Sequence, residues 1–224
     1  MKLAIFYVDG TLVDSQAMIA ASLTAAFRAE GLAVPERTRM MSIVGLSLVD
    51  AMAALAPGHE PTQHERLAAA YKEAFWQHRA NGEHTETLFP GAEELLVKLR
   101  ACDGVALGIA TGKSRRGVAH LIEKHGWEGW FATIQTSDDH PSKPHPSMIT
   151  TALAEAATAA TRTIMIGDTS YDIAMARAAG VWAAGVTWGN HPAVELTKAG
   201  AHTIANDFND LECQLDSLWQ EGAA

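Results

Sequence analysis

The sequence predicts an α/β fold, a doubly wound parallel sheet of the Rossmann-like type, with an all-helical segment inserted after its first strand. Three observations support this prediction. Short unbroken apolar runs recur along the chain, as expected for strands that are buried on both faces. From about residue 90 onward, amphipathic helical patterns separate these runs. Residues 15 to 85, by contrast, contain several helical stretches and no convincing strand.

The first predicted strand is the apolar run Leu3 to Val8, which ends at Asp9 and Gly10. The other runs, each bounded by glycine or small polar residues, are Val105 to Ala110, Thr163 to Ile166 and Val181 to Val186, with weaker ones at Thr133 to Gln135 and Thr203 to Ile204. The run at the start is far shorter than the roughly 20 residues of a membrane-spanning helix. It also lacks a signal-peptide pattern, so the sequence predicts no membrane partner and a cytoplasmic location.

Helices are predicted between these strands. The clearest are Ala92 to Ala101 and Ser114 to Gly126; in the second, apolar or aromatic residues recur at i, i+3, i+4 and i+7 from Val118, and Gly126 suits a C-terminal stop. The alanine-rich segment Ala152 to Ala160 favours a helix or the end of one, and the last dozen residues favour a surface helix. Open sheets of this class bind ligands outside the carboxyl ends of their strands. Functional residues are therefore expected just after each strand.

The helical insert is built mainly from Ser15 to Glu30 and Glu65 to His78. It leaves the core directly after the first strand and returns near Leu88 to Gly91, so it can close over the end of that strand. We therefore expect a core domain of residues 1–14 and 86–224 and a helical cap domain of residues 15–85.

Charge and cysteine content narrow the class of protein. The 224 residues include 17 Lys and Arg against 26 Asp and Glu, which gives a net charge of −9 and disfavours a nucleic-acid partner. The two cysteines, Cys102 and Cys213, lack the spacing of a zinc or redox motif and are predicted to be free thiols. The acidic composition is compatible with a monomer or a homodimer.

Polar groups that could form a functional site follow the strands Leu3 to Val8 and Val105 to Ala110. Asp9, in Asp9-Gly10-Thr11, can act as a general acid or base, although the tripeptide alone is also an ordinary turn. Thr111 and Gly112 open the helix after the strand Val105 to Ala110, where a hydroxyl and free backbone N–H groups suit a phosphate oxygen. The alternative is that Thr111 or Ser114 only caps the helix.

Two further groups lie later in the chain. Lys143 stands between prolines on a stiff segment, which can aim its ammonium group, unless it is an ordinary surface lysine. Asp168 and Asp172 follow the strand Thr163 to Ile166 and are four residues apart. If the turn runs into a helix, that spacing places both carboxylates on one helix face, as two ligands of one Mg²⁺ require. A helix N-cap would explain Asp168 but not Asp172.

Together and in this order, these groups resemble the haloacid dehalogenase-like (HAD) superfamily of hydrolases, in particular its phosphoglycolate phosphatase and β-phosphoglucomutase-like branch. The segment Val8 to Ser15 is similar to the second half of the first family motif, Thr111 to the second, Lys143 to the third, and Asp168 with Asp172 to the fourth. The resemblance covers essentially the whole chain. It implies Mg²⁺-dependent hydrolysis of a small phosphorylated metabolite through an aspartyl-phosphate intermediate.

The resemblance also implies a role for each residue. Asp9 would protonate the leaving oxygen and later deprotonate water, and its backbone carbonyl would bind Mg²⁺. Thr111, Gly112 and Lys143 would hold the phosphate. Asp168 would bind Mg²⁺ directly, and Asp172 would support the metal shell.

Tyr7 departs from this pattern, because the family's nucleophile is an aspartate at this position. A phenol has an ordinary pKa of about 10, and burial at the end of a strand would disfavour the phenolate further. Tyr7 is therefore a poor nucleophile, its ring would fill space meant for phosphate, and the metal would lose a carboxylate ligand. The sequence predicts a phosphatase that is inactive or nearly so.

Two explanations of Tyr7 remain open. In the first, Tyr7 is a cloning or engineered change in an otherwise intact phosphatase, which the retention of the other five site residues favours. In the second, the chain is a natural non-catalytic binding or regulatory protein on the same scaffold. A dehalogenase fits less well, since that branch does not need the acid role of Asp9. A phosphonate-cleaving enzyme would need a cap lysine as a Schiff base, and Lys72 is placed in mid-helix.

Overall fold

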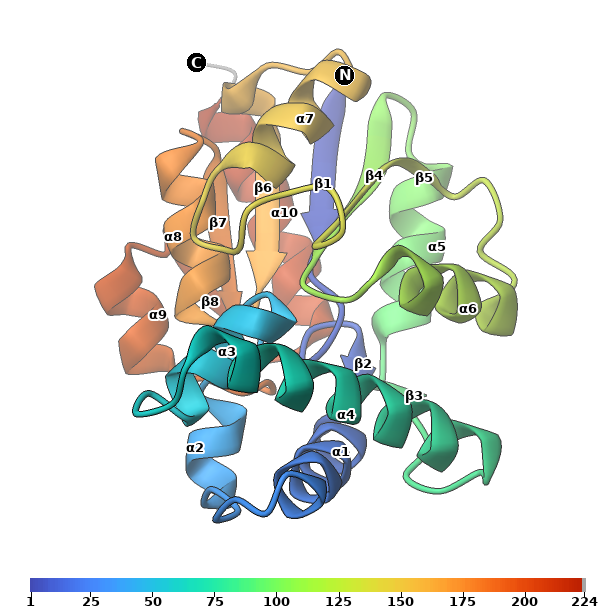
Figure 1. The fold of residues 1–224 in the computed structure, drawn as a ribbon. Helices are drawn as coiled ribbons and strands as arrows, with labels where there is room; N and C mark the ends of the chain where they lie inside the picture. Colours follow the sequence, from blue (N-terminus) through green and yellow to red (C-terminus); the bar gives the residue numbers. More distant parts are fainter. Residues whose placement is uncertain (223–224) are drawn as a thin grey trace.

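The computed structural model describes residues 1–222 and shows a parallel sheet covered by helices on both faces, with a group of helices at one end (Figure 1). The sheet has six strands in the order β5-β4-β1-β6-β7-β8, all in parallel pairing. The strands are β1 (Lys2–Phe6), β4 (Val105–Thr111), β5 (Phe131–Thr136), β6 (Thr163–Gly167), β7 (Trp182–Val186) and β8 (Thr203–Ala205). The predicted α/β class is confirmed, and both weak strands of the sequence are present.

The helices that cover the sheet are α5 (Ala92–Ala101), α6 (Arg115–His125), α7 (Ser147–Glu155), α8 (Ser170–Ala178), α9 (Ala193–Ala199) and α10 (Phe208–Glu221), with a short 3₁₀ turn at Ala160–Arg162. Gly126 ends α6 in a left-handed conformation with φ 67°, as predicted. The segment Ala152 to Ala160 contains the end of α7, as one of the two predictions for it had it, and the chain turns at Ala157. Residues 223 and 224, part of the predicted terminal helix, lie outside the described residues.

Alternate residues of β1 enter different layers of the core, because successive side chains of a strand point to opposite faces. Ala4 and Phe6 pack in a cluster with apolar residues of α5, α6 and α10. Leu3, Ile5 and Tyr7 belong to a second cluster, which contains residues of α7, α8 and α9 and also of the helical insert. Tyr7 therefore joins the apolar core that the sheet shares with the insert.

The insert contains α1 (Gln16–Ala29), α2 (Arg37–Met41), α3 (Leu48–Leu55) and α4 (Pro61–Ala80). It is flanked by β2 (Val13–Asp14) and β3 (Thr87–Leu88), which pair antiparallel and bring the two connections to the core side by side. The sequence did not indicate these two-residue strands, since they are too short to carry a periodic pattern. In Figure 1 the four helices stand at the end of the sheet toward which the strand arrows point.

The remaining sequence-based features can also be located. Cys102 and Cys213 are free and exposed, as predicted. Within residues 1–222, no helix combines the length and apolar character that a membrane crossing would need.

Candidate active site

The predicted site residues lie at or just after the carboxyl ends of β1, β4 and β6 and, for Lys143, between β5 and α7. The carboxyl ends of the strands point toward the insert (Figure 1). The sheet grows from β1 through β4 to β5 at one edge and resumes with β6 on the opposite side of β1. Such a reversal in strand order opens a crevice between the loops that follow two adjacent strands. Tyr7 follows β1 and Asp168 follows β6, so both stand at this crevice.

Tyr7 is buried, with only 2% of its surface exposed. The Nζ atom of Lys143 lies 3.7 Å from the centre of its ring, an arrangement in which the cation is attracted to the aromatic face. Burial, and then the negative charges of Asp9 and Asp172, raise the pKa of the Tyr7 phenol well above its ordinary value. The phenol is therefore protonated at neutral pH, in agreement with the sequence-based expectation.

Lys143 and Asp172 form a fully buried ion pair, with 2.5 Å between Nζ and Oδ1. Lys143 also donates to the carbonyl of Ala110 at 3.2 Å. The other oxygen of Asp172 accepts from the N–H of Thr169 at 3.1 Å and from its hydroxyl at 2.7 Å, which closes a capping box on α8. Burial lowers the pKa of the Lys143 ammonium, and the charge of Asp172 opposes that fall.

Asp168 is fully buried and accepts three hydrogen bonds. The Thr11 hydroxyl donates to Oδ1 at 2.8 Å, and the backbone N–H and side-chain amide of Asn190 both donate to Oδ2 at 2.8 Å. Burial, and then the charge of Asp172, raise the pKa of Asp168 to about 7, although these hydrogen bonds oppose the rise. The sequence analysis missed Asn190, although its place just after the strand Val181 to Val186 was the signal that could have found it.

Asp9 belongs to a chain of alternating charges beside the cavity. Its Oδ1 atom lies 3.0 Å from Nζ of Lys113, which lies 3.0 Å from Oε1 of Glu86, and Glu86 also pairs with Arg79. Burial would lower the pKa of Lys113, but the carboxylates of Asp9 and Glu86 outweigh it and raise the pKa. Glu86 lies within the segment that returns from the insert, and no local pattern in the sequence marked it.

Thr111 and Gly112 lie where the loop after β4 meets the insert. The Thr111 hydroxyl is buried and accepts from the N–H of Lys113 at 3.1 Å, while Ser114 caps α6. A Cβ atom at Gly112 would lie 2.7 Å from the carbonyl oxygen of Leu46, so only glycine allows this approach of the two loops. The alternative of a helix cap is thus confirmed for Ser114, whereas the phosphate contacts of Thr111 and Gly112 stay a prediction.

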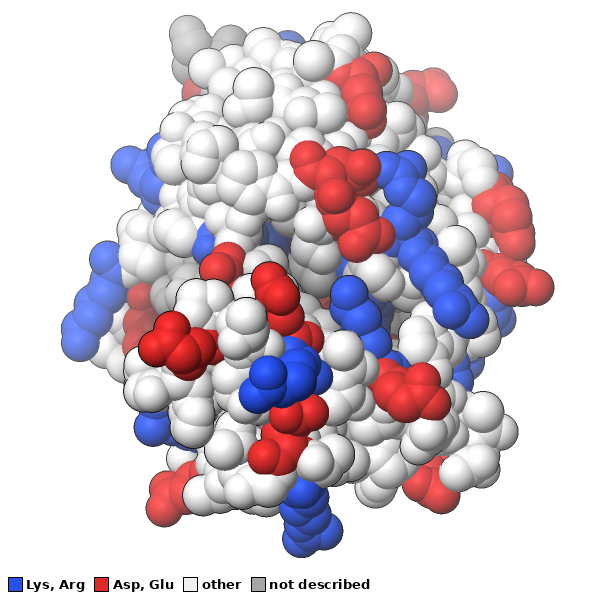
Figure 2. Space-filling view, viewed as in Figure 1, with Lys and Arg blue, Asp and Glu red and all other residues white. Residues whose placement is uncertain are grey.

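A cavity of about 490 Å³ lies between the sheet and the insert. Its lining includes Tyr7, Asp9, Gly112 and Lys113 from the core side and mainly apolar residues from the insert, among them Ile43, Val44, Leu46, Met52 and Phe75. Lys143, Asp168 and Asp172 are more deeply buried and are not part of this lining within residues 1–222. Figure 2 shows blue and red side chains bordering the hollow between the two parts of the molecule.

The oxygen atoms that would hold Mg²⁺ are already engaged by protein donors. The side-chain amide of Asn190 donates to Asp168 Oδ2 and, at 3.4 Å, to the backbone carbonyl of Asp9. Both oxygens of Asp172 accept from Lys143 or Thr169. Tyr7 supplies no carboxylate, although Mg²⁺ sites in proteins are built mainly from carboxylate, phosphate and water oxygens. In this arrangement, the residues present do not fit a magnesium ion.

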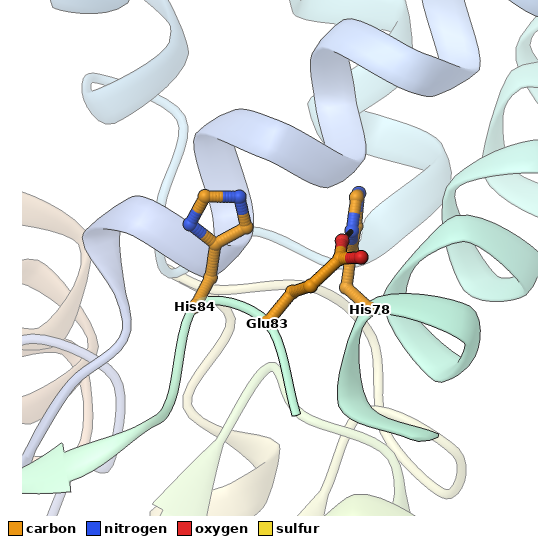
Figure 3. A group of neighbouring side chains, drawn as sticks. All are labelled: His78, Glu83 and His84. Carbon is orange, nitrogen blue, oxygen red and sulfur yellow. Dashed lines mark hydrogen bonds and ion pairs between the residues drawn. The ribbon is translucent and has the colours of Figure 1, made fainter. Parts of the chain in front are cut away.

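A second group of metal-binding residue types lies at the end of α4. The ligand atoms of His78, Glu83 and His84 are within 4.8 Å of one another, and the three side chains gather beside the loop after the helix (Figure 3). His78 Nδ1 is 2.7 Å from a carboxylate oxygen of Glu83. The sequence analysis missed this group because the histidines are six residues apart. None of these three residues lines the cavity, although Arg79, which follows His78 in α4, does.

Comparisons with known proteins agree with this geometry. The sequence model of the family described as "Haloacid dehalogenase-like hydrolase" matches residues 4–186. The chain is 32% identical over 213 residues to "Probable phosphatase IndB" of Dickeya dadantii, covering 93% of this chain and 91% of that protein. It is 31% identical over 225 residues to a phosphoglycolate phosphatase of Agrobacterium fabrum, covering 99% and 96%. A hydrolase from Pseudomonas syringae superposes with a TM-score of 0.83 at 26% identity, covering 97% and 99%.

Proposed function

The chain belongs to the haloacid dehalogenase-like hydrolases, and from that premise we propose that its cavity binds a small phosphate monoester while Tyr7 prevents turnover. The scaffold is that of a phosphatase in this family, as its phosphatase-named relatives indicate. The proposal assigns residues 1–14 and 86–224 to the core domain and residues 15–85 to a cap domain over the cavity.

The contact between Tyr7 and Lys143 carries the proposal. Tyr7 lines the cavity, and Lys143 does not. The Nζ atom of Lys143 lies 3.7 Å from the centre of the Tyr7 ring and is paired with Asp172. The ammonium group is therefore covered by the ring, and its charge is already neutralised. A phosphate in the cavity would therefore meet the ring of Tyr7 before it reached the lysine that the family pattern assigns to it.

Tyr7 also cannot replace the missing aspartate chemically. Its protonated phenol is a weak nucleophile, and the raised pKa removes the phenolate that could attack phosphorus. Asp9, by contrast, lines the cavity and is placed to exchange a proton with a ligand there. The position of Asp9 in the cavity lining supports its proposed role as acid and base, whereas Tyr7 cannot supply the nucleophile.

Thr111, the last residue of β4, and Gly112, which lines the cavity, are the proposed phosphate contacts, and Lys113 is a cation on the core side of that lining. Mg²⁺, which this family generally uses, would neutralise phosphate charge when bound. Its proposed ligands are the Asp9 carbonyl, Asp168 and, through the metal shell, Asp172. We assign Mg²⁺ dependence to the enzyme with an aspartate restored at position 7, because that carboxylate would supply the metal ligand that Tyr7 does not.

The substrate is proposed only as a class. A cavity of about 490 Å³ under the proposed helical cap suits a small phosphorylated metabolite and excludes a folded phosphoprotein. The name of the Agrobacterium relative makes phosphoglycolate a candidate. The cytoplasmic location and the monomeric or homodimeric state remain predictions from the sequence.

The proposal is tested by phosphate release from a panel of small phosphate monoesters in the presence of Mg²⁺. We expect no turnover by the chain itself and measurable turnover by Tyr7→Asp. Tyr7→Asn is the matched control, since it opens the same space without a nucleophilic carboxylate. Turnover by the unaltered chain would contradict the role given to Tyr7. If no variant turns over, the result favours the alternative, a non-catalytic binding or regulatory protein on this scaffold.

A further inference from the structure

Asn190 makes the contacts that a metal ion would make at this centre. Its side-chain nitrogen lies 2.8 Å from Asp168 Oδ2 and 3.4 Å from the backbone carbonyl oxygen of Asp9. These two oxygens belong to the groups that the family pattern assigns to Mg²⁺. Both are hydrogen-bond acceptors, so the amide must present its NH₂ group to them and not its oxygen. One donor group thus bridges the loop after β1 and the loop after β6.

The loop that carries Asn190 is built closely around Asp168. The N–H of His191 donates to the Asp168 carbonyl at 3.2 Å, and the Trp188 indole donates to the Thr11 carbonyl at 3.0 Å. A Cβ atom at Gly10 or at Gly189 would overlap the Asp168 side chain, so glycine is required at both positions for this packing. Asn190 is therefore held in place by its neighbours on both sides.

The charge balance around the site also differs from that of a magnesium centre. Asp9, Asp168, Asp172 and Glu86 are set among the cations Lys113, Lys143 and Arg79. A carboxylate at position 7 would add a further negative charge to this group, and a divalent cation would then be needed to offset it. The neutral Tyr7 removes that need.

From these contacts we infer that the side-chain amide of Asn190 replaces the divalent cation in this chain, so that the centre is assembled without Mg²⁺. The inference rests on the proposed function, because it concerns the same site. It adds a positioning residue that links the loops after β1, β6 and β7. Asn190→Asp should reverse the arrangement, since a carboxylate there would face two other oxygen acceptors with no donor between them.

The test measures metal binding and stability, and neither readout requires turnover. Mn²⁺ binding is followed by electron paramagnetic resonance in a His84→Ala background, because His78, Glu83 and His84 could bind the ion independently. We expect no saturable binding by the chain with Asn190, and a thermal midpoint that changes by less than about 1 °C between EDTA and millimolar Mg²⁺. Asn190→Asp should bind Mn²⁺, and its midpoint should fall by about 5 °C in EDTA and recover with Mg²⁺.

Asn206→Asp is the matched control. Its amide also donates to a carboxylate, that of Asp210, but at an exposed position. It should show neither Mn²⁺ binding nor Mg²⁺-dependent recovery. Saturable Mn²⁺ binding by the His84→Ala protein that retains Asn190 would overturn the inference. A folded Asn190→Asp variant that does not bind Mn²⁺ would overturn it as well. If Asn190→Asp does not fold, Mn²⁺ binding by the His84→Ala protein that retains Asn190 still tests the inference. Failure of Tyr7→Asp to turn over would contradict the proposed function and leave this result untouched.

Discussion

Two lysines at the carboxyl end of the sheet differ in their access to the cavity. Lys143 is fully buried, paired with Asp172 and covered by the ring of Tyr7. Lys113 lines the cavity, and its ammonium is shared between Asp9 and Glu86. A cation that is enclosed with one partner stabilises the fold, whereas a cation at a cavity wall can exchange its partner for a ligand. We therefore propose that Tyr7 keeps Lys143 out of contact with a ligand in the cavity, so that the role of Lys143 here is structural.

The largest effect on stability is expected where the buried pair is broken. Lys143→Met leaves the Asp172 carboxylate buried without its cation, and the free energy of unfolding should fall by about 3 to 5 kcal/mol. Urea denaturation measures this, and Lys98→Met, at an exposed pair with Glu212, is the control that should leave the midpoint nearly unchanged. A double variant, Lys143→Met with Asp172→Asn, should recover part of the loss. A loss below about 1 kcal/mol would contradict a structural role.

A smaller, pH-dependent effect is expected at Glu86. Burial alone would raise the pKa of its carboxyl group, but Lys113 and Arg79 outweigh burial and hold the pKa below its ordinary value. The resulting stabilisation is complete above the unfolded-state pKa of about 4.3 and is lost as the pH falls through the lower folded-state pKa.

Glu86→Gln should therefore cost about 2 kcal/mol at pH 7. The difference between the two proteins should shrink as the pH is lowered from about 5 toward 3. Chemical denaturation across this range measures it, with Glu123→Gln, at an exposed carboxylate, as the control. A difference that is constant with pH would show that Lys113 and Arg79 do not hold Glu86 ionised.

The smallest effect is expected on ligand affinity. Lys113→Met removes the cation from the cavity wall and should weaken binding of phenyl phosphate about tenfold, or about 1.4 kcal/mol. Isothermal titration calorimetry measures the affinity, and Lys72→Met, an exposed lysine at the insert side of the same cavity, is the control. Equal losses in the two variants would indicate a general electrostatic effect and not a specific contact by Lys113.

The local patterns were enough to predict most of the core. Apolar runs and amphipathic periods depend on residues close in sequence, so the strands and the helix ending at Gly126 could be located from them. The polar groups that follow the strands in the sequence likewise indicated a site at the carboxyl ends of the strands. The two-residue strands β2 and β3 and the ends of α7 were not predicted, because tertiary contacts and not periodicity determine them.

The sequence by itself determined the α/β class, the family motifs and the substitution at Tyr7. Only the tertiary structure decided that the ring of Tyr7 covers Lys143 and that Asn190 bridges Asp9 and Asp168. Asn190 and Asp9 are 181 positions apart in the chain. Their contact depends on the order of the strands and on close packing at two glycines, and neither is encoded in a local pattern.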